Sequence, residues 1–117
     1  MEKAVTFDEL ALLSKIKTKP GLYFGQPSLK SLRDMLGGMS YAFSVCGQPD
    51  ALFYFNHFTK WYNAQLMEKD KNGYACWWNH ILYISGGFDD QAFFNFFRAF
   101  EKYLMDVHKL TLPPSDH

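Results

Sequence analysis

The sequence predicts a compact all-α domain of about five helices joined by short turns. Apolar residues recur at the three- and four-residue spacing of an amphipathic helix, most clearly over residues 29–43 and 93–107. Prolines and glycines separate such stretches, as at Pro20-Gly21 and Gly47–Pro49, and stop one helix before the next begins. The apolar fraction of 48% is ample for a hydrophobic core. We therefore expect residues 1–117 to form a single domain with loose ends at 1–5 and 110–117.

The first helix is expected over residues 7–17, followed by a corner. Thr6 and Glu9 have capping-box spacing, in which each side chain bonds to a backbone N–H at the start of the helix. The corner, residues 17–28, contains two prolines and two glycines. Neither a helix nor a central strand can run through such a segment.

The second helix is predicted to begin after Ser28, a good N-cap residue, and to continue to about Val45. Gly37 and Gly38 lie in its middle, where each glycine costs about 1 kcal/mol relative to alanine. We expect another backbone or a bulky ring to pack closely on this turn, or the helix to bend there. Gly47 is a typical stop signal.

Two later segments are compatible with a helix or a strand. Pro49-Asp50 can open a third helix that continues to about Leu66, but the aromatic run 52–55 also suits a short strand. Residues 76–84 are ambiguous because periodicity alone does not assign short apolar runs. As a helix, this segment would have one face made of Trp77, Ile81 and Ile84. The alternative fold is therefore α+β, with a short strand at one of these places.

The last helix is predicted to begin at Asp89, which has the character of an N-cap residue. Phe88 and Phe93 have the spacing of a hydrophobic staple across that cap. The buried face is expected to consist of Phe93, Phe96, Phe97, Phe100, Leu104 and Val107. Charged residues of this segment fall mostly on the opposite side, as in an amphipathic helix.

The charge balance and the cysteines narrow the classes of partner and compartment. Twelve basic and twelve acidic residues give zero formal charge, so no global field favours nucleic acid or an anionic membrane. Cys46 and Cys76 lack metal-site spacing and are too few for a disulfide scaffold; we expect buried free thiols in a reducing compartment. We recognise no signal peptide or membrane-spanning run, and expect a cytoplasmic protein.

Little in the sequence predicts catalysis. His57 and His80 lie among aromatic residues and are expected to be half-buried and hydrogen-bonded, whereas His108 and His117 are expected to be exposed. We recognise no zinc, EF-hand, Walker or nucleophile-elbow motif. We therefore expect no metal, no cofactor and no enzyme activity. A cysteine could act with a histidine only if the fold brought the two together.

The aromatic content, 19% of the residues, exceeds what one small core needs. In one interpretation the rings replace aliphatic side chains in the core. In the other, some rings stay on the surface as anchors for a protein partner or line a groove for an apolar ligand. Tyr23 and Phe24 are expected to turn inward and set the angle of the corner. A homodimer of the free protein would also cover surplus rings.

Several short motifs follow one another in a fixed order over residues 17–104. They are a (K/R)PGxYxG turn at Lys19–Gly25, Ser28-Leu29-x-x-Leu32, Gly37-Gly38, Phe55-x-x-Phe58-x-x-Trp61, Trp78-x-x-Ile81-Leu82 and a Phe-rich final helix. This order resembles that of small bacterial proteins from toxin–immunity loci, including contact-dependent growth inhibition. The resemblance implies a cytosolic protein that binds and blocks the toxin domain of a neighbouring cell's effector.

The leading hypothesis is an immunity protein that blocks the active site or substrate face of a cognate toxin, as a monomer in the complex. If the toxin is a nuclease, acidic side chains would mimic phosphate, and the candidates are Asp34, Glu68, Asp70, Asp89 and Asp90. The candidate anchors are Tyr23, Trp77 and Trp78. The alternative is a small enzyme or ligand-binding domain with an aromatic pocket that contains His57 or His80.

Overall fold

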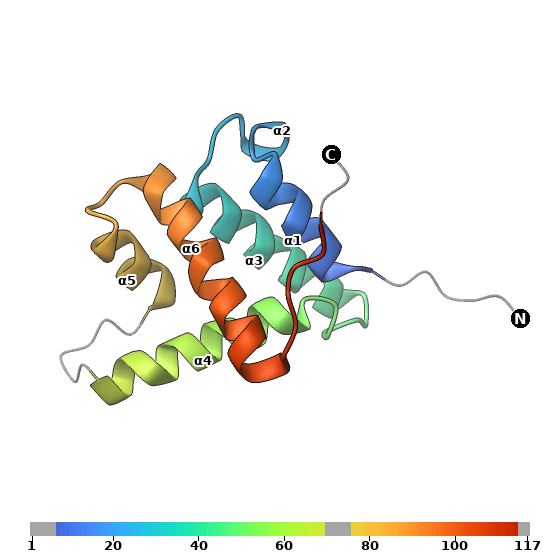
Figure 1. Ribbon diagram of the computed structural model, residues 1–117. Coiled ribbons are helices and arrows are strands. Elements are labelled where there is room, and N and C mark those ends of the chain that lie inside the picture. The colour runs from blue at the N-terminus through green and yellow to red at the C-terminus, as the bar shows by residue number, and fades with distance from the viewer. Residues whose placement is uncertain (1–6, 70–75, 115–117) are drawn as a thin grey trace, which may run out of the picture.

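Helices follow one another along the whole described part of the chain, residues 7–69 and 76–114 of the computed structural model (Figure 1). They are α1 (Glu9–Thr18), α2 (Gly21–Phe24), α3 (Leu29–Val45), α4 (Phe53–Lys69), α5 (Trp77–Ile84), α6 (Asp89–Tyr103) and a π-helical turn, η1 (Leu104–His108). Residues 7–69 and 76–114 contain no strand, which confirms the all-α prediction. Both segments for which a strand was considered are helical, since residues 53–55 begin α4 and residues 77–84 form α5.

The central element of the fold is α6, which packs against α3 and α5. In Figure 1, α5 lies on one side of α6, α1 and α3 lie on the other, and α4 crosses near its C-terminal end. The aromatic face of α6 meets α4 at Phe58, whose ring contacts the rings of Phe96, Phe100 and Tyr103. All four side chains are inaccessible to solvent. Rings therefore fill the centre of the core, where edge-to-face contacts add to the gain from apolar burial.

The buried face of α6 agrees with the predicted stripe except at its end. The residues that are buried as predicted are Phe93, Phe96, Phe97, Phe100 and Leu104. Val107 is exposed, contrary to the prediction. The cause is η1, because a π-helical turn is wider than an α-helical turn and changes the angle between successive side chains. The same turn makes His108 half-buried, so its predicted exposure was also wrong.

Asp8 caps α1, in place of the predicted capping box. Its carboxylate accepts a hydrogen bond from the backbone N–H of Ala11 at 3.1 Å. Glu9, the predicted acidic member of the box, is buried and turned toward another helix. The predicted box is therefore wrong at Glu9, and Thr6 lies outside the described residues.

The start of α4 is capped by a side chain from α1. The carboxylate of Glu9 accepts hydrogen bonds from the backbone N–H groups of Tyr54 and Phe55, at 2.9 and 2.6 Å. These are two of the N–H groups that a helix leaves without an internal partner at its start. The helix begins at Phe53 and not at the predicted Pro49-Asp50, because the groups that satisfy its first turn come from α1.

The bounds of α3 are those predicted. The hydroxyl of Ser28 accepts a hydrogen bond from the backbone N–H of Ser31 at 3.1 Å, which confirms the N-cap. The expected close contact at Gly37 and Gly38 is not observed. Both glycines are exposed, and no heavy atom of the described residues lies within 4 Å of where a Cβ would be, apart from the helix itself.

The corner between α1 and α3 contains the single helical turn α2, which begins after Pro20. Gly25 ends this turn with φ +79°, a left-handed conformation that favours glycine. Phe24 turns inward as expected and its ring contacts that of Phe93. Tyr23 does not, because it lies on the exposed side of this short turn.

The expected burial of the two cysteines is wrong, since Cys46 and Cys76 are both free and exposed. Cys46 lies at the C-cap of α3, and Cys76 lies at the N-cap of α5. Apolar neighbours in the sequence predicted burial, but helix ends lie where the chain turns at the surface.

Residues 110–114 run back across α1 (Figure 1). The hydroxyl of Ser14 donates a hydrogen bond to the carbonyl of Pro113. Leu112 packs against the core. This part of the expected loose end therefore covers the outer side of α1.

Candidate functional site

Three of the sequence-predicted site residues lie around one pocket between α3 and α5. Trp78 and Asp89 line this pocket, and Asp34 bonds to Arg33, which also lines it. Asp90 follows Asp89 and is exposed. Helices α3 and α5 thus bring together residues that are far apart in the sequence.

The other predicted residues lie elsewhere. Trp77 is 7% exposed, and its ring contacts the rings of Phe58 and Phe96, so its side chain belongs to the core. Tyr23 is exposed on α2. The side chain of Glu68 and the whole of Asp70 lie outside the described part of the chain.

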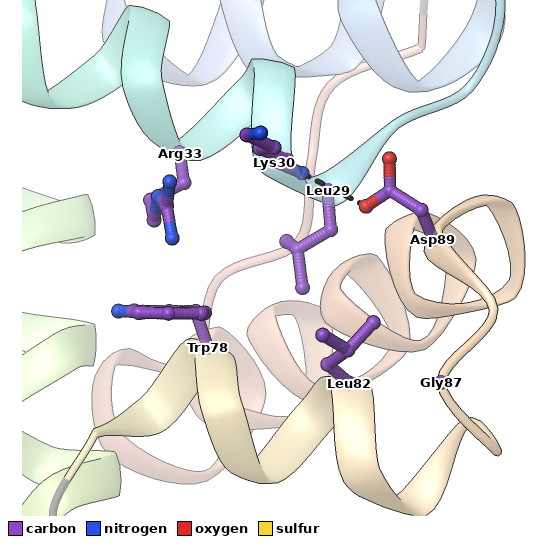
Figure 2. Close-up of a pocket in the computed structure, with 7 residues that line it drawn as sticks. All are labelled: Leu29, Lys30, Arg33, Trp78, Leu82, Gly87 and Asp89. Atoms are coloured by element: carbon purple, nitrogen blue, oxygen red, sulfur yellow. Dashed lines mark hydrogen bonds between the residues drawn. The ribbon is translucent and has the colours of Figure 1, made fainter.

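The pocket has a volume of about 460 Å³ and lies beside the first turns of α3. It is lined by Leu29, Lys30, Arg33, Trp78, Leu82, Gly87 and Asp89. Figure 2 shows Leu29 and Leu82 extending toward one another from α3 and α5 to form its apolar floor. The polar groups lie around this floor, which is the usual arrangement of a binding pocket.

Arg33 is held in place by two neighbours. Its guanidinium carbon lies 4.2 Å from the centre of the Trp78 ring, a cation–π contact (Figure 2). Its Nε and Nη2 atoms both donate to one carboxylate oxygen of Asp34, at 3.0 and 2.9 Å. These contacts fix the guanidinium plane over the indole and leave its other N–H groups for a ligand.

Asp89 caps α3 and not its own helix. One carboxylate oxygen accepts the backbone N–H of Lys30 at 3.0 Å, and the other accepts the hydroxyl of Ser28. The N-cap of α6 is Phe88, so the predicted capping role of Asp89 in α6 is wrong. An acidic residue before an apolar stripe indicates a cap, but the sequence cannot tell which helix start it will meet.

Large apolar side chains are exposed at the end of α5 and in the turn before α6, close in the sequence to residues that line the pocket. Tyr83 is 64% exposed, Ile84 56% and Phe88 66%. Gly86 and Gly87 both have positive φ, and the turn they form leaves Phe88 on the surface, so the predicted staple with Phe93 is not formed. Ile84 was predicted to share a helix face with Trp77 and Ile81; those two are buried, whereas Ile84 is exposed because α5 ends there. The exposure of these side chains was missed by sequence reasoning.

A second, smaller pocket is lined by rings. It has a volume of about 310 Å³ and is lined by Trp61, Tyr62, Gln65, Leu66, His80, Ala99 and Lys102. The Tyr62 hydroxyl lies 2.7 Å from His80 Nδ1. Burial raises the pKa of the Tyr62 hydroxyl, which stays protonated. His80 is half-buried and hydrogen-bonded, as predicted.

A buried tyrosine joins two histidines at the other end of α4. The Tyr103 hydroxyl lies 2.7 Å from His57 Nδ1 and 2.7 Å from His108 Nε2. Burial first, and then the charges of Glu9 and Tyr54, raise the pKa of Tyr103 to about 12. Burial and His57 lower the pKa of His108. His57 is thus half-buried and hydrogen-bonded, as predicted.

Two features are absent from residues 7–69 and 76–114. No three histidine, cysteine or acidic side chains in these residues are grouped so as to hold a metal ion. None of the helices formed by these residues combines the length and apolar character needed to cross a bilayer. No protein-family model, curated protein or solved structure matches the chain.

Proposed function

We propose that this protein is an immunity protein that binds a cognate bacterial toxin in the cytoplasm and blocks its active site or substrate face. The order of motifs over residues 17–104 supports the class of protein. The observation that carries the mode of action is the exposure of Tyr83, Ile84 and Phe88, each within two positions in the sequence of a residue that lines the α3–α5 pocket. We name these three residues together with Arg33 and Trp78 the α5 surface.

The α5 surface has the composition of a protein-binding site. Exposed large apolar side chains near a concave, partly polar site are typical of surfaces that bind partners. Aromatic residues and arginine are enriched among the residues that dominate binding energy, and the surface includes Trp78, Tyr83, Phe88 and Arg33. A standard interface buries about 800 Å² on each partner, so the toxin would extend from the pocket over α5 and its following turn.

The acidic residues contribute unequally to this proposal. Asp89 bonds to Ser28 and to the backbone of Lys30, which commits its carboxylate to α3. Asp34 and Asp90 are exposed, and Asp34 accepts from Arg33 through one carboxylate oxygen, so among the predicted acids that the structure describes these two can still meet a basic toxin face. The exposed free thiols of Cys46 and Cys76 fit the reducing cytoplasm in which the toxin would be met.

Growth rescue tests the proposal directly. The candidate toxin is the polypeptide encoded beside this protein, and its toxicity is first confirmed by expression alone. We expect co-expression to restore growth and the two proteins to co-purify. Phe88→Ala should weaken binding by about 2 kcal/mol, roughly thirtyfold in Kd. Failure of rescue with a toxin of confirmed activity would remove the proposal.

A matched control uses another exposed tyrosine. Tyr41 is 74% exposed on α3, about 18 Å along the helix axis from Leu29. Tyr83→Ala should weaken toxin binding at least tenfold, whereas Tyr41→Ala should leave it unchanged. Equal effects of the two substitutions would place the interface elsewhere on the molecule.

A ligand-binding domain or small enzyme is the second candidate function, because the pocket of Trp61, Tyr62 and His80 is concave and ring-lined. Planar aromatic compounds are the class of ligand that such rings would bind. Quenching of tryptophan fluorescence by a panel of these compounds, abolished by Trp61→Leu and retained in Trp78→Leu, would favour this function. Absence of quenching across the panel would count against it.

A further inference from the structure

The charged side chains around the α3–α5 pocket are two cations and two carboxylates, but they are unequally paired. Arg33 is paired with Asp34 through two hydrogen bonds. Asp89 accepts hydrogen bonds at the start of α3, where the positive end of the helix dipole offsets its charge. The Lys30 ammonium forms no ion pair with any residue in 7–69 or 76–114. The Lys30 ammonium is therefore the cation of this pocket that remains available to an anionic group of a ligand.

The cations and the apolar floor lie on different parts of the pocket lining. Leu29 and Leu82 form the floor, and the Trp78 ring forms one wall beneath Arg33 (Figure 2). A pocket of about 460 Å³ has room for one large side chain and the group next to it. An apolar group on the floor would thus lie close to both Lys30 and the unused N–H groups of Arg33.

We propose that this pocket binds an acidic side chain that directly follows a bulky apolar side chain in the partner protein. The apolar side chain occupies the floor between Leu29 and Leu82. The carboxylate accepts hydrogen bonds from Lys30 and from the guanidinium N–H groups of Arg33 that Asp34 does not use. A carboxylate fits better than a phosphate because Lys30 is the one cation of the pocket without an ion pair to the described residues, and a phosphate dianion would need a second. This inference rests on the proposed function, since the acidic segment would belong to the toxin.

Short peptides test the pocket without the toxin. The probe is N-acetyl-Phe-Asp-amide, and its isosteric control is N-acetyl-Phe-Asn-amide, which lacks only the charge. Binding is followed by NMR at the indole N–H groups of the three tryptophans and at the backbone amides of Lys30 and Arg33. We expect the Asp peptide to bind with a Kd on the order of 1 mM. It should move the Trp78 signal and leave those of Trp61 and Trp77 in place.

Charge and salt provide the decisive comparison. The Asn peptide should bind about three- to fivefold more weakly than the Asp peptide, as expected for one exposed ion pair. High salt should reduce this difference, because it screens exposed charges. Lys30→Gln should abolish the difference, whereas Lys60→Gln, at an exposed lysine on α4 that does not line the pocket, should retain it.

Two results would overturn the inference. One is equal affinity for the two peptides in the wild-type protein. The other is a response at Trp61 without one at Trp78, which would place the peptide in the second pocket. Peptide binding without growth rescue would remove the proposed function and leave the pocket chemistry intact. Growth rescue by a complex that does not depend on Lys30 would support the proposed function and overturn the inference about the pocket.

Discussion

Tyr103 has one hydroxyl proton and two histidine neighbours. Its oxygen lies 2.7 Å from both ring nitrogens, and these nitrogens are 3.4 Å apart. The hydroxyl can donate to one imidazole and accept from the other, so both bonds form when one of the two facing nitrogens bears hydrogen and the other does not. If both imidazoles were protonated, two N–H groups would face the hydroxyl, and the hydroxyl hydrogen would have no ring nitrogen to accept it. The two positive charges would also repel each other. The cluster is therefore satisfied only while at least one histidine is neutral.

Stability should fall on acidification because of His108. Burial and His57 lower its pKa in the folded protein, and Tyr54, Tyr103 and the Phe53 ring surround it. Below an unfolded pKa of about 6.5 the unfolded chain binds more protons than the folded protein does, so stability decreases as the pH falls. Thermal unfolding from pH 7.5 to pH 5 should show this decrease.

His108→Gln provides the comparison for this prediction. Glutamine retains a polar group near Tyr103 but does not titrate. We expect the variant to lose part of the decrease in unfolding temperature between about pH 6.5 and pH 5. A decrease as large as that of the wild type would show that other groups cause it.

At the scale of the helix, the N-termini of two helices are capped by a carboxylate from another helix. The Glu9 carboxylate of α1 accepts hydrogen bonds from the backbone N–H groups of Tyr54 and Phe55 in α4. The Asp89 carboxylate of α6 accepts hydrogen bonds from the Lys30 backbone N–H and the Ser28 hydroxyl at the start of α3. Each contact satisfies groups that the capped helix cannot satisfy itself, and it also fixes how two helices meet. Single residues thus determine both a helix start and a packing angle.

Replacing Glu9 should destabilise the fold. Glu9→Ala leaves the N–H groups of Tyr54 and Phe55 without their acceptor at a buried position, at a cost of about 1–3 kcal/mol. Glu101→Ala is the control, since Glu101 forms a surface ion pair with Lys17, worth about 0–1 kcal/mol. Urea unfolding measures both. Equal small losses would show that solvent replaces the Glu9 carboxylate without penalty.

Removing the two central glycines of α3 should stabilise the protein. Gly37→Ala and Gly38→Ala should each gain about 0.5–1 kcal/mol, because both positions are helical and a Cβ meets no atom of the described residues within 4 Å. Gly25→Ala is the opposite case and should lose stability, because its φ is +79°. Urea unfolding distinguishes the three variants. A loss of stability at residues 37 and 38 would show that the glycines serve a contact in the folded protein.

How much of the fold the sequence predicts depends on the range of the interaction that sets each feature. The bounds of α3 are predicted because Ser28 and the apolar spacing act within the helix itself. The start of α4 is not, because Glu9 caps it from another helix. Phe88 is another such case, since the turn conformation of Gly86 and Gly87 decides that it faces solvent. Sequence patterns reflect interactions within one segment, whereas contacts between distant segments are known only once the fold is known.

At the scale of the whole molecule, the same limit applies to the candidate site. Trp78 and Asp89 were predicted as site residues from their type, but Lys30 and Arg33 were not, because nothing near them in the sequence indicates a pocket. They become site residues only when α3 lies beside α5. The helical spacing placed Trp77 on a face with Ile81, but both tryptophans were still predicted as anchors, since the burial of a ring cannot be read from sequence. The structure places Trp77 in the core and Trp78 beside Arg33.

These adjacent tryptophans separate the stability of the fold from binding by its surface. Trp77→Ala should cost about 3–5 kcal/mol, because it removes a buried ring that contacts Phe55, Phe58 and Phe96. Trp78→Ala should cost less, on the order of 1 kcal/mol, since it removes a half-buried ring and its cation–π contact with Arg33. Urea unfolding gives both values.

Binding should show the opposite order when it is expressed per folded molecule. Trp78→Ala removes one wall of the pocket and frees Arg33, so the affinity for the toxin should fall at least tenfold. Trp77→Leu retains an apolar side chain in the core, and the fraction that folds should bind with an affinity close to that of the wild type. If Trp77→Leu weakened binding as much as Trp78→Ala, the core and the α5 surface would not be separable. The shape of the surface would then depend on how the central rings pack, and the toxin would recognise the arrangement of α5 on α6 more than the side chains that α5 exposes.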